Sequence, residues 1–293
     1  MTAAIPNLID WGVKRLSEAG VENPRSEAEL LLAEALSIER HGLWLHPERL
    51  LNQEEISRCR SFIERRSARE PFAYITGRKE FWSLDFKVNP EVIAPRPETE
   101  CLIECLIAIA SEKPERQDLM ILDLGTGSGN IAVTAARELP GSRVIAVDII
   151  PGALAMAGEN IRRHGLSDRI HLVQSDLFAG LGPGKAGQFD YILSNPPYIK
   201  SREIDKLMPE VRDHEPRGAL DGGAAGLEFY ERIISGSRAM LRQGGFLILE
   251  IGQDQAGEVA QLIETQGGYA SPNVRQDYSG RDRILSVQRR ECG

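Results

Sequence analysis

The chain has 293 residues, of which 42% are hydrophobic and 27% are charged, and its formal net charge is −8. This length allows one large domain or two smaller ones with a substantial core, and the composition is ordinary for a globular protein. An acidic chain lacks the basic surface that phosphate neutralisation requires, which argues against nucleic acid as the substrate. No apolar run is long enough to span a membrane.

The four cysteines are Cys59, Cys101, Cys105 and Cys292, and none lies in a Cys-x-x-Cys motif. Cys101 and Cys105 are one helical turn apart, which permits zinc ligation, but no His or Cys partner lies near them in the sequence. The beginning of the chain lacks the basic and then apolar pattern of a signal peptide. We therefore expect a cytoplasmic monomer without a metal, a disulfide or a membrane anchor.

Residues 1–70 are predicted to form a small α-helical domain. Apolar side chains repeat at helical spacing after Ile5, after Pro24 and between Glu54 and Ser67, and a shorter helical piece is predicted over His41 to Leu50. Such a domain either serves only for packing or acts as a cap that recognises a substrate or partner. The residue pattern alone leaves both interpretations open.

Residues 71–95 are predicted to form a linker that contains a β-hairpin, because the stretch from Phe72 to Val88 is rich in aromatic and β-forming residues. Pro97 then precedes a predicted helix, with Thr99 near its cap. The turn Pro95-Arg-Pro-Glu-Thr-Glu100 is either a plain helix start or a cover over a cofactor cleft.

An apolar strand, Met120 to Leu124, is followed by a glycine-rich turn and a helix over Ile131 to Leu139. Glycines let the backbone approach a ligand closely, and a helix N-terminus favours polar or negative groups. The glycines alternate and residue 130 is Asn, so the turn fits S-adenosylmethionine better than the pyrophosphate of a dinucleotide. A structural turn is the alternative. The residues of this turn are Gly125, Thr126, Gly127, Ser128 and Gly129.

Acidic residues also mark the ends of the next two predicted strands. Asp148 ends the strand that begins at Arg143, and its carboxylate is suited to accept hydrogen bonds from both ribose hydroxyls, with helix capping as the alternative. After the strand Ile170 to Gln174, Asp176 is expected to hold the adenine amino group and Leu177 to pack on the ring. Both are also ordinary loop residues.

The strand Phe189 to Ser194 is followed by Asn195-Pro196-Pro197-Tyr198, where the prolines end the strand. The Asn195 side-chain oxygen and the Pro196 carbonyl are two acceptors for the N–H groups of an amide or aromatic amine, and they favour a nitrogen with a freer lone pair. Tyr198 offers a face for stacking. Such a site acts by positioning and electrostatics. A plain turn is the alternative.

The carboxyl ends of these four strands are expected to meet at one edge of a parallel sheet. Residues 199–225 are predicted to be a long irregular insert that serves as a lid or substrate contact, with disorder as the alternative. The remaining predicted elements are a helix over 226–242, a strand over 244–251, a helix over 254–266, and a final edge hairpin with strands at Val274 and at Arg283 to Gln288.

With these motifs, the chain resembles the HemK/PrmC family of peptide chain release factor glutamine N5-methyltransferases. The matching segments cover nearly the whole chain in order. They are Tyr74-Ile-Thr-Gly77, Phe81 to Phe86, Pro95 to Glu100, Asp123 to Gly129, Val147-Asp148, Ser175-Asp176, Ser194 to Tyr198, Glu215 to Leu220, Asp221-Gly-Gly223 and Glu250 to Gln253.

The resemblance implies an α/β class I S-adenosylmethionine-dependent methyltransferase domain over residues 96–293. This domain is Rossmann-like, with about seven strands and an antiparallel last edge strand, and residues 1–70 are then a substrate-recognition domain. The implied reaction transfers a methyl group to the side-chain amide N5 of the glutamine in the Gly-Gly-Gln motif of release factors. The implied partner is therefore a protein, and no direct contact with nucleic acid is expected.

The resemblance also assigns roles to residues. Leu177 stands where some members have Trp beside the adenine, a difference that should alter stacking but not chemistry. The implied cofactor residues are Gly125, Thr126, Gly127, Ser128, Gly129, Asp148, Asp176, Leu177 and Asn195. The implied catalytic residues are Asn195, Pro196 and Tyr198, which with Pro197 also bind the substrate amide.

Three alternatives remain open at this point. The first is a glutamine methyltransferase that acts on a ribosomal protein, although Pro95 to Glu100 is more similar to the release-factor branch. The second is an adenine-N6 nucleic-acid methyltransferase, which shares Asn-Pro-Pro-Tyr but needs a basic face and a target-recognition domain. The third is a non-catalytic binding module, which the intact Asn195 disfavours.

Overall fold

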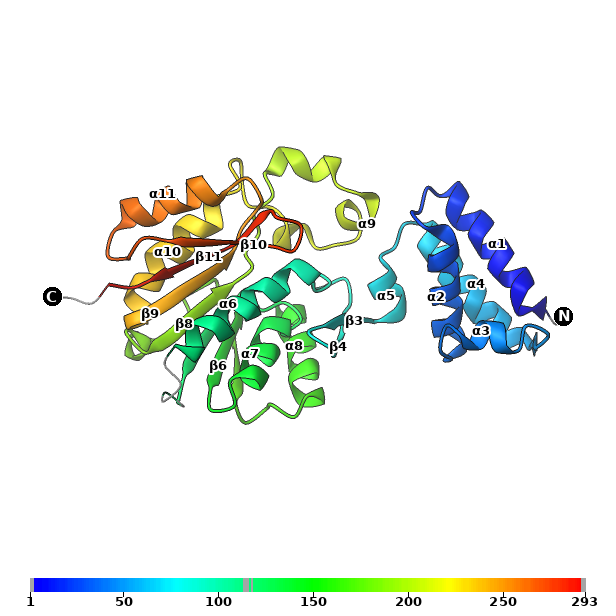
Figure 1. Ribbon diagram of the computed structural model, residues 1–293, viewed down its shortest axis with the longest axis horizontal. Coiled ribbons are helices and arrows are strands. Elements are labelled where there is room, and N and C mark those ends of the chain that lie inside the picture. The colour runs from blue at the N-terminus through cyan, green and yellow to red at the C-terminus, as the bar shows by residue number, and fades with distance from the viewer. Residues whose placement is uncertain (1–2, 113–115, 117, 291–293) are drawn as a thin grey trace. The chain divides into compact units, whose positions relative to one another are not determined.

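The computed structural model describes residues 3–112, 116 and 118–290, and these residues form two compact units (Figure 1). The first unit contains the chain up to Arg78 together with Met208–His214. The second contains Lys79–Leu207 and the chain from Glu215 onward. The division by packing therefore falls between Arg78 and Lys79. The predicted domain boundaries at residues 70 and 95 stay a prediction.

The first unit is a helical bundle. Its core is a continuous apolar cluster to which α1, α2 and α4 contribute Leu16, Leu32 and Ile63, all of them fully buried. Asn52 caps α4, since its side chain accepts a hydrogen bond from the Glu55 backbone N–H while the Glu55 carboxylate accepts one from the Asn52 N–H. The elements of this bundle are β1 (Ala3–Ala4), α1 (Ile5–Glu18), α2 (Pro24–Leu36), α3 (Gly42–Leu45), β2 (Leu50–Leu51), α4 (Gln53–Ser67) and α5 (Phe72–Thr76).

A short helix from the distant insert, α9 (Pro209–Arg212), belongs to this unit as well. Its Glu210 carboxylate accepts hydrogen bonds from Arg66 at 2.9 Å and from Arg69 at 2.7 Å. All three side chains are less than one-fifth exposed, and Arg66 also binds Glu27 at 2.9 Å. Residues 208–214 are therefore fixed to the helical bundle by a nearly buried ion-pair network.

The second unit is built on a seven-stranded sheet with the order β10-β11-β9-β8-β5-β6-β7. The five strands β9, β8, β5, β6 and β7 are parallel to one another. The strand β11 is antiparallel to both of its neighbours, β9 and β10. The expected seven-stranded sheet is therefore confirmed, and its last strand, β11, is antiparallel, although β10 rather than β11 occupies the edge. The strands are β5 (Met120–Leu124), β6 (Arg143–Asp148), β7 (Ile170–Gln174), β8 (Phe189–Ser194), β9 (Leu241–Glu250), β10 (Asn273–Gln276) and β11 (Asp282–Gln288).

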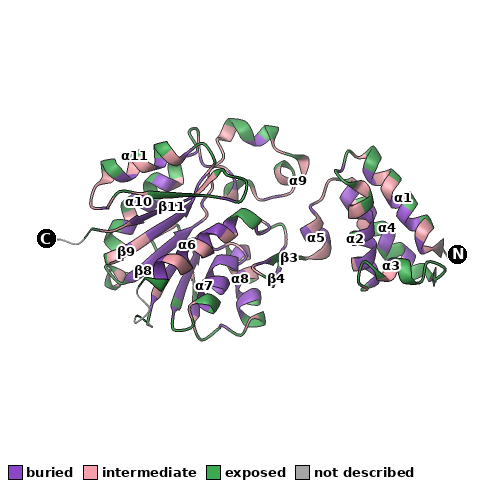
Figure 2. Cartoon of the chain, in the orientation of Figure 1, coloured by how far each residue is buried: buried purple, intermediate pink, exposed green. Residues whose placement is uncertain are grey.

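Helices cover both faces of this sheet. The apolar cluster on one face includes side chains of α6 (Glu100–Ser111), α7 (Asn130–Glu138) and α8 (Pro151–Arg163), and the cluster on the other includes side chains of α10 (Glu228–Met240) and α11 (Ala256–Gln266). Figure 2 shows the inner strands of the sheet as largely buried, whereas the edge strand β10 is exposed at every position. The central strand β8 is buried at every position, as expected for a strand with both faces covered.

Most predicted elements are confirmed, and a few details differ from the prediction. The segment Phe72–Thr76 is the helix α5, so the hairpin is confined to β3 (Arg78–Phe81) and β4 (Leu84–Lys87). Between His41 and Leu50, only Gly42–Leu45 is α-helical. Thr99 is the N-cap residue of α6, as predicted, although its side chain makes no capping hydrogen bond.

The insert over residues 199–225 is also more regular than predicted, and the alternative of disorder is wrong. It contains η3 (Ser201–Lys206), α9 and η4 (Arg217–Ala219). Ile199 is bridged to Asp221 in parallel, which closes the base of the insert on the second unit. The sequence did not predict these short helical turns, because the apolar spacing that indicates a helix appears only over more than one turn.

Cys59, Cys101 and Cys105 are buried free thiols, and burial raises the pKa of each. Cys292 lies outside the described residues. Within the described ranges, no three His, Cys, Asp or Glu side chains are grouped as metal ligands would be. Every helix in those ranges is too short or too polar to cross a bilayer.

Candidate active site

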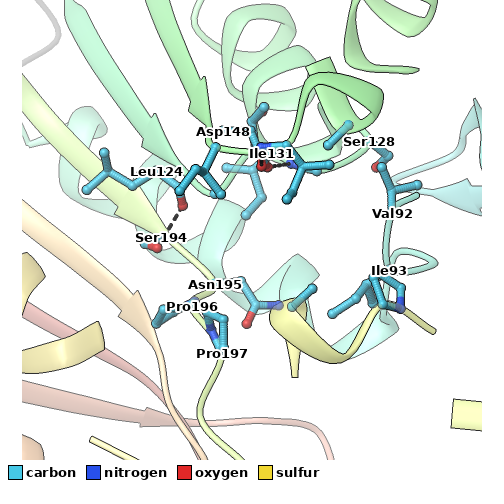
Figure 3. Close-up of a pocket in the computed structure, with 18 of the residues that line it drawn as sticks. Val92, Ile93, Leu124, Ser128, Ile131, Asp148, Ser194, Asn195, Pro196 and Pro197 are labelled. Atoms are coloured by element: carbon cyan, nitrogen blue, oxygen red, sulfur yellow. Dashed lines mark hydrogen bonds between the residues drawn. The ribbon is translucent and has the colours of Figure 1, made fainter. Parts of the chain in front are cut away.

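A cavity of about 480 Å³ lies at the carboxyl ends of β5, β6, β7 and β8 in the second unit. Figure 3 shows Asn195, Pro196 and Pro197 on one side of this cavity and Asp148 and Ser128 on the opposite side. Further lining comes from the loop before α6, the end of the insert, and α10. These contributions are Pro90 to Arg96 and Thr99, then Pro216, Gly218 and Ala219, and finally Phe229 and Ile233.

The glycine turn is tied to the neighbouring strand, because the backbone N–H groups of Gly125 and Thr126 both donate to the Val147 carbonyl at 2.9 Å. Gly125 and Gly127 have φ values of 72° and 53°, a region that L side chains rarely adopt. A Cβ atom at either position would meet nothing within 4 Å. Both glycines line the cavity, so the absence of a Cβ atom leaves open space in which a ligand can approach the protein backbone.

Gly129 differs from the other two glycines of the turn. A Cβ atom there would come within 3.2 Å of the Ala157 side chain, so Gly129 allows α7 and α8 to approach each other. The hydroxyls of the turn also have structural partners. Thr126 donates to the buried Asp123 carboxylate at 2.6 Å, and Ser128 donates to Asn130 at 3.1 Å. The sequence pattern groups all five residues, but the structure gives only some of them open access to the cavity.

Asp148 joins the end of β6 to the glycine turn. One carboxylate oxygen accepts from the Gly127 N–H at 2.9 Å and the other from the Ile150 N–H at 3.0 Å. The side chain is half-buried and lines the cavity. Asp148 is not the cap of α8, whose N-cap position is Ile150.

Asp176 and Leu177 follow β7 and both line the cavity. The Asp176 carboxylate is exposed and accepts a hydrogen bond from Arg232 at 2.6 Å, a partner that the sequence pattern did not reveal. Leu177 has a φ of 49°, so the loop turns sharply at this residue. The side chain of Leu177 also packs against the apolar cluster that includes α10.

Asn195 is held in position from two directions. The hydroxyl of the preceding Ser194 donates to the Leu124 carbonyl at 2.8 Å, which ties the end of β8 to the end of β5 (Figure 3). The Asn195 side-chain Nδ2 donates to the Thr99 hydroxyl at 3.1 Å. Thr99 in turn donates to the Glu250 carboxylate at 2.6 Å, in a buried contact. The Asn195 oxygen is left available as an acceptor beside the cavity.

Tyr198 is not part of the cavity lining, although it follows the lining residues Asn195, Pro196 and Pro197. Its hydroxyl donates to Glu250 at 3.5 Å, and its backbone carbonyl accepts from the Gln255 side chain at 3.1 Å. Burial and the nearby Glu250 carboxylate raise the pKa of Tyr198. The tyrosine ring therefore lies beneath the site, packed against the core, rather than in the cavity.

Glu250 is 1% exposed, and burial raises its pKa to about 7 in spite of the opposing effects of Thr99 and Arg283. It ends β9 and collects hydrogen bonds from Thr99 and Tyr198. Sequence reasoning placed Glu250 only in a segment similar to a known family. The signal in the sequence was the position of Glu250 at the end of a buried apolar strand. The other strands that carry predicted site residues also end next to polar residues.

The second half of the insert returns to the cavity wall. Arg96 donates to both oxygens of the buried Glu215 carboxylate, at 2.7 and 2.6 Å. Burial nevertheless raises the pKa of Glu215. The Ser201 hydroxyl donates to Asp221 at 2.6 Å, and this bond lowers the pKa of Asp221. Together these contacts hold the cavity-lining residues between Glu215 and Asp221.

Comparison with known proteins gives the family. Residues 7–77 match the PrmC N-terminal domain, and residues 98–211 match the methyltransferase small domain. The release factor glutamine methyltransferase of Geobacter sulfurreducens is 42% identical over 96% of this chain and 95% of its own length. The protein of the same name from Moorella thermoacetica is 44% identical over 95% and 96%.

The chain belongs to the release factor glutamine methyltransferase family. It is therefore a methyltransferase that uses S-adenosylmethionine, as its sequence predicted. Among solved structures, a methyltransferase from Pyrococcus furiosus matches with a TM-score of 0.54 and 19% identity, over 73% of this chain and 92% of its own. The hMettl16 catalytic domain matches with a TM-score of 0.55 and 18% identity, over 81% and 84%. These two likenesses concern the fold.

Proposed function

We propose that this chain methylates the side-chain amide N5 of the glutamine in the Gly-Gly-Gln motif of a peptide chain release factor. Two relatives at 42% and 44% identity over almost their full lengths are named as release factor glutamine methyltransferases. The observation that carries the proposal is the orientation of Asn195. Its amide nitrogen is bound to Thr99, so its oxygen remains as an acceptor for a substrate N–H at the cavity.

The residues on the opposite side of the cavity fit S-adenosylmethionine. Gly125 and Gly127 leave space that a Cβ would fill, and Asp148 holds the glycine turn from the end of β6. We infer that these residues, with Leu177 and Asp176, hold the cofactor. Arg232 occupies only the Oδ2 atom of Asp176, so Oδ1 remains an acceptor for the adenine amino group. When bound, S-adenosylmethionine supplies an electrophilic methyl group.

An amide nitrogen is a weak nucleophile because its lone pair is delocalised. Acceptors at Asn195 Oδ1 and the Pro196 carbonyl bind the two amide N–H groups of the substrate and favour a nitrogen with a freer lone pair. With S-adenosylmethionine held on the opposite side of the cavity, Asn195 and Pro196 would direct this lone pair toward the methyl group that the cofactor would supply, and the methylated nitrogen would give up one proton to water. These residues act by orientation and electrostatics, without a covalent intermediate.

Tyr198 has a supporting role in this proposal. Since its ring lies against the core and its hydroxyl contacts Glu250, it stabilises the turn that presents Asn195 and Pro196 rather than stacking on the substrate from within the cavity. Pro197 lines the cavity and keeps the preceding backbone extended.

The helical unit is proposed to recognise the release factor. Its α3 and β2 carry three large apolar side chains that are at least half exposed, at 50% for Trp44, 65% for Leu45 and 62% for Leu50. Exposed apolar side chains of this size are suited to a protein partner. The proposal also includes a cytoplasmic location and a monomeric enzyme that makes no direct contact with nucleic acid, in keeping with the net charge of −8.

Methyl transfer from labelled S-adenosylmethionine tests this function directly. The acceptors are a purified release factor, the same factor with its Gly-Gly-Gln changed to Gly-Gly-Ala, a ribosomal protein fraction and duplex DNA. We expect label on the intact factor alone, with mass spectrometry placing the methyl group on the glutamine. Label on ribosomal protein or on DNA instead would overturn the assigned substrate and leave the methyltransferase fold unaffected.

A further inference from the structure

The Thr99 hydroxyl lies between the side chains of Asn195 and Glu250. It accepts a hydrogen bond from Asn195 Nδ2 at 3.1 Å and donates one to Glu250 Oε2 at 2.6 Å. Thr99 is 2% exposed and Glu250 is 1% exposed, so the hydrogen bond between them is shielded from bulk solvent. The three residues come from three separate elements: the turn before α6, the end of β8 and the end of β9.

A threonine hydroxyl carries one hydrogen. Because that hydrogen is directed to the Glu250 carboxylate, the Thr99 oxygen can only accept from Asn195. The amide of Asn195 must then present its NH₂ group to Thr99, and its oxygen points elsewhere. The ionised Glu250 carboxylate, two hydrogen bonds away from Asn195, thus determines which end of the Asn195 amide is available for a substrate.

We propose that Thr99 and Glu250 are positioning residues that fix the Asn195 amide with its oxygen toward the substrate amide. This inference rests on the proposed function, because it assigns the pair a role in the same methyl transfer. Neither residue touches the reacting atoms. Thr99 acts through Asn195, and Glu250 acts through Thr99.

The proton on Glu250 decides the direction of this chain of hydrogen bonds. A carboxyl protonated on Oε2, the oxygen that faces Thr99, donates to Thr99, and the threonine hydroxyl then donates to the Asn195 oxygen. Asn195 would present its NH₂ group to a substrate that also presents N–H groups, so two donors would oppose each other. The amide orientation required for methyl transfer therefore needs Oε2 without a proton, and ionisation of Glu250 guarantees this.

The surroundings of Glu250 place this change near neutral pH. Burial is the largest influence and raises its pKa to about 7, while the Thr99 hydrogen bond and Arg283 oppose the rise. The nearby charged and titratable groups, from the elements around it, are Arg283 on β11, Glu98 on η1 (Pro97–Thr99), Cys101 on α6, Tyr198 after β8 and Tyr230 on α10. The turnover number is thus expected to rise as pH increases through about 7.

The test compares four variants with the unchanged chain. Glu250→Gln keeps the shape but gives Thr99 an NH₂ donor, Thr99→Val removes the hydroxyl, and Thr99→Ser restores it. Thr134→Val is the matched control, because the Thr134 hydroxyl is equally buried and has no hydrogen-bond partner in the described part of the chain. Methylation kinetics with a release factor are measured from pH 6 to 9, and S-adenosylmethionine affinity is measured by calorimetry.

We expect Glu250→Gln to lower kcat by about 10²-fold, in the range seen when one preorganised polar group is lost from a reaction site. Thr99→Val should lower kcat by roughly 10-fold and remove the rise of kcat with pH, whereas Thr99→Ser should stay within about 3-fold of the unchanged chain. The effect should fall on kcat more than on KM, because most of the binding surface of a protein substrate lies away from the reacting amide. Cofactor affinity should be unchanged in all four, which also shows that they fold.

Three results would overturn the positioning role. They are a Glu250→Gln variant with unchanged kcat, a Thr99→Ser variant as impaired as Thr99→Val, and a Thr99→Val variant that keeps the full rise of kcat with pH. A loss of activity in Thr134→Val equal to that in Thr99→Val would show a general packing effect and also overturn it. If the unchanged chain places no label on the release factor, the proposed function fails, and the positioning role fails with it.

Discussion

The Gly127 backbone N–H donates to the Asp148 carboxylate at 2.9 Å and joins the turn after β5 to the end of β6. The second oxygen of the same carboxylate accepts from the Ile150 N–H at 3.0 Å. Asp148 therefore shapes the glycine turn, in addition to the ribose contact that we propose for it. A single carboxylate thus couples the two parts of the cofactor site that lie on neighbouring strands.

Asp148→Asn should weaken both functions of this residue. An asparagine keeps one acceptor oxygen and places an NH₂ group against one of two backbone donors, so one charge-assisted hydrogen bond is lost. We expect a loss of about 1–2 kcal/mol in the free energy of unfolding. We also expect the affinity for S-adenosylmethionine to fall on the order of 10-fold or more. Urea denaturation and calorimetry measure the two effects.

The matched control for this variant is Asp85→Asn. Asp85 binds Arg163 at 2.6 Å, but both side chains are at least one-third exposed and neither lines the cavity. A surface pair of this kind contributes less than about 1 kcal/mol. Equal losses of cofactor affinity in the two variants would contradict the role of Asp148.

Gly125→Ala and Gly165→Ala separate backbone strain from obstruction of the cavity. Their φ values are 72° and 69°, and a Cβ at either position meets nothing within 4 Å. Because an alanine is strained at such a φ value, each substitution should lower the free energy of unfolding by roughly 1–2 kcal/mol. Only Gly125 lines the cavity, so only Gly125→Ala should weaken S-adenosylmethionine binding, by about 10-fold. If Gly165→Ala weakens binding as much, the cavity is not the cofactor site.

Asn195→Ala should remove the acceptor oxygen while leaving the cofactor side of the cavity intact. We expect kcat with a release factor to fall by about 10²–10³-fold. The dissociation constant for S-adenosylmethionine should stay within roughly 3-fold. Asn273→Ala, on the exposed strand β10, is the control and should keep full activity. An Asn195→Ala enzyme with normal turnover would contradict the mechanism.

Glu210→Ala should destabilise the helical unit. The substitution removes the carboxylate partner of Arg69 and one of the two carboxylate partners of Arg66 in a nearly buried environment. This loss should lower the free energy of unfolding by roughly 2–3 kcal/mol. Trp11 and Trp44 lie in this unit, so their fluorescence in a Trp82→Phe background reports its unfolding in urea. The exposed Glu203 provides the control, since Glu203→Ala should have almost no effect.

The same contact has a predictable pH dependence. Burial opposes ionisation of Glu210, but its bonds to Arg69 and Arg66 prevail and hold its pKa below 4.5. A carboxylate with a lowered pKa in the folded state stabilises the fold above its unfolded pKa and loses this contribution as pH falls through the folded value. The difference between the unchanged chain and Glu210→Ala should therefore shrink below about pH 4.5. A constant difference down to the lowest accessible pH would contradict the ion pair.

Glu250 and Asp123 should give the opposite pH dependence. Burial raises the pKa of each to about 7, from 4.5 and 3.8 respectively. The folded state then holds more protons than the unfolded state over this interval, so the contribution of these two groups to stability is greatest at low pH and declines as pH rises toward about 7. Glu250→Gln removes one of these groups and should flatten the decline between pH 5 and 7. An unchanged slope would show that Glu250 ionises normally in the folded protein.

Local sequence patterns were sufficient for the elements of the sheet. The apolar runs before Gly125, Asp148 and Asn195 predict strands, and the intervening helical stripes predict the parallel crossovers. Since the carboxyl ends of parallel strands share one edge, the meeting of these residues around one cavity follows from the order of elements alone. Short helical turns such as α9 and η4 were not predictable in this way, because one turn shows no repeating period.

The sequence by itself therefore determined the fold and the edge of the sheet where the strands that carry the motifs end. The partners of the motif residues were decided only by the tertiary structure. Thr99 meets Glu250 across 151 positions and Glu210 meets Arg66 across 144, and no local spacing relates either pair. Secondary structure follows from contacts between near neighbours, whereas a side-chain hydrogen bond depends on how distant elements pack. That packing gives Asn195 its orientation.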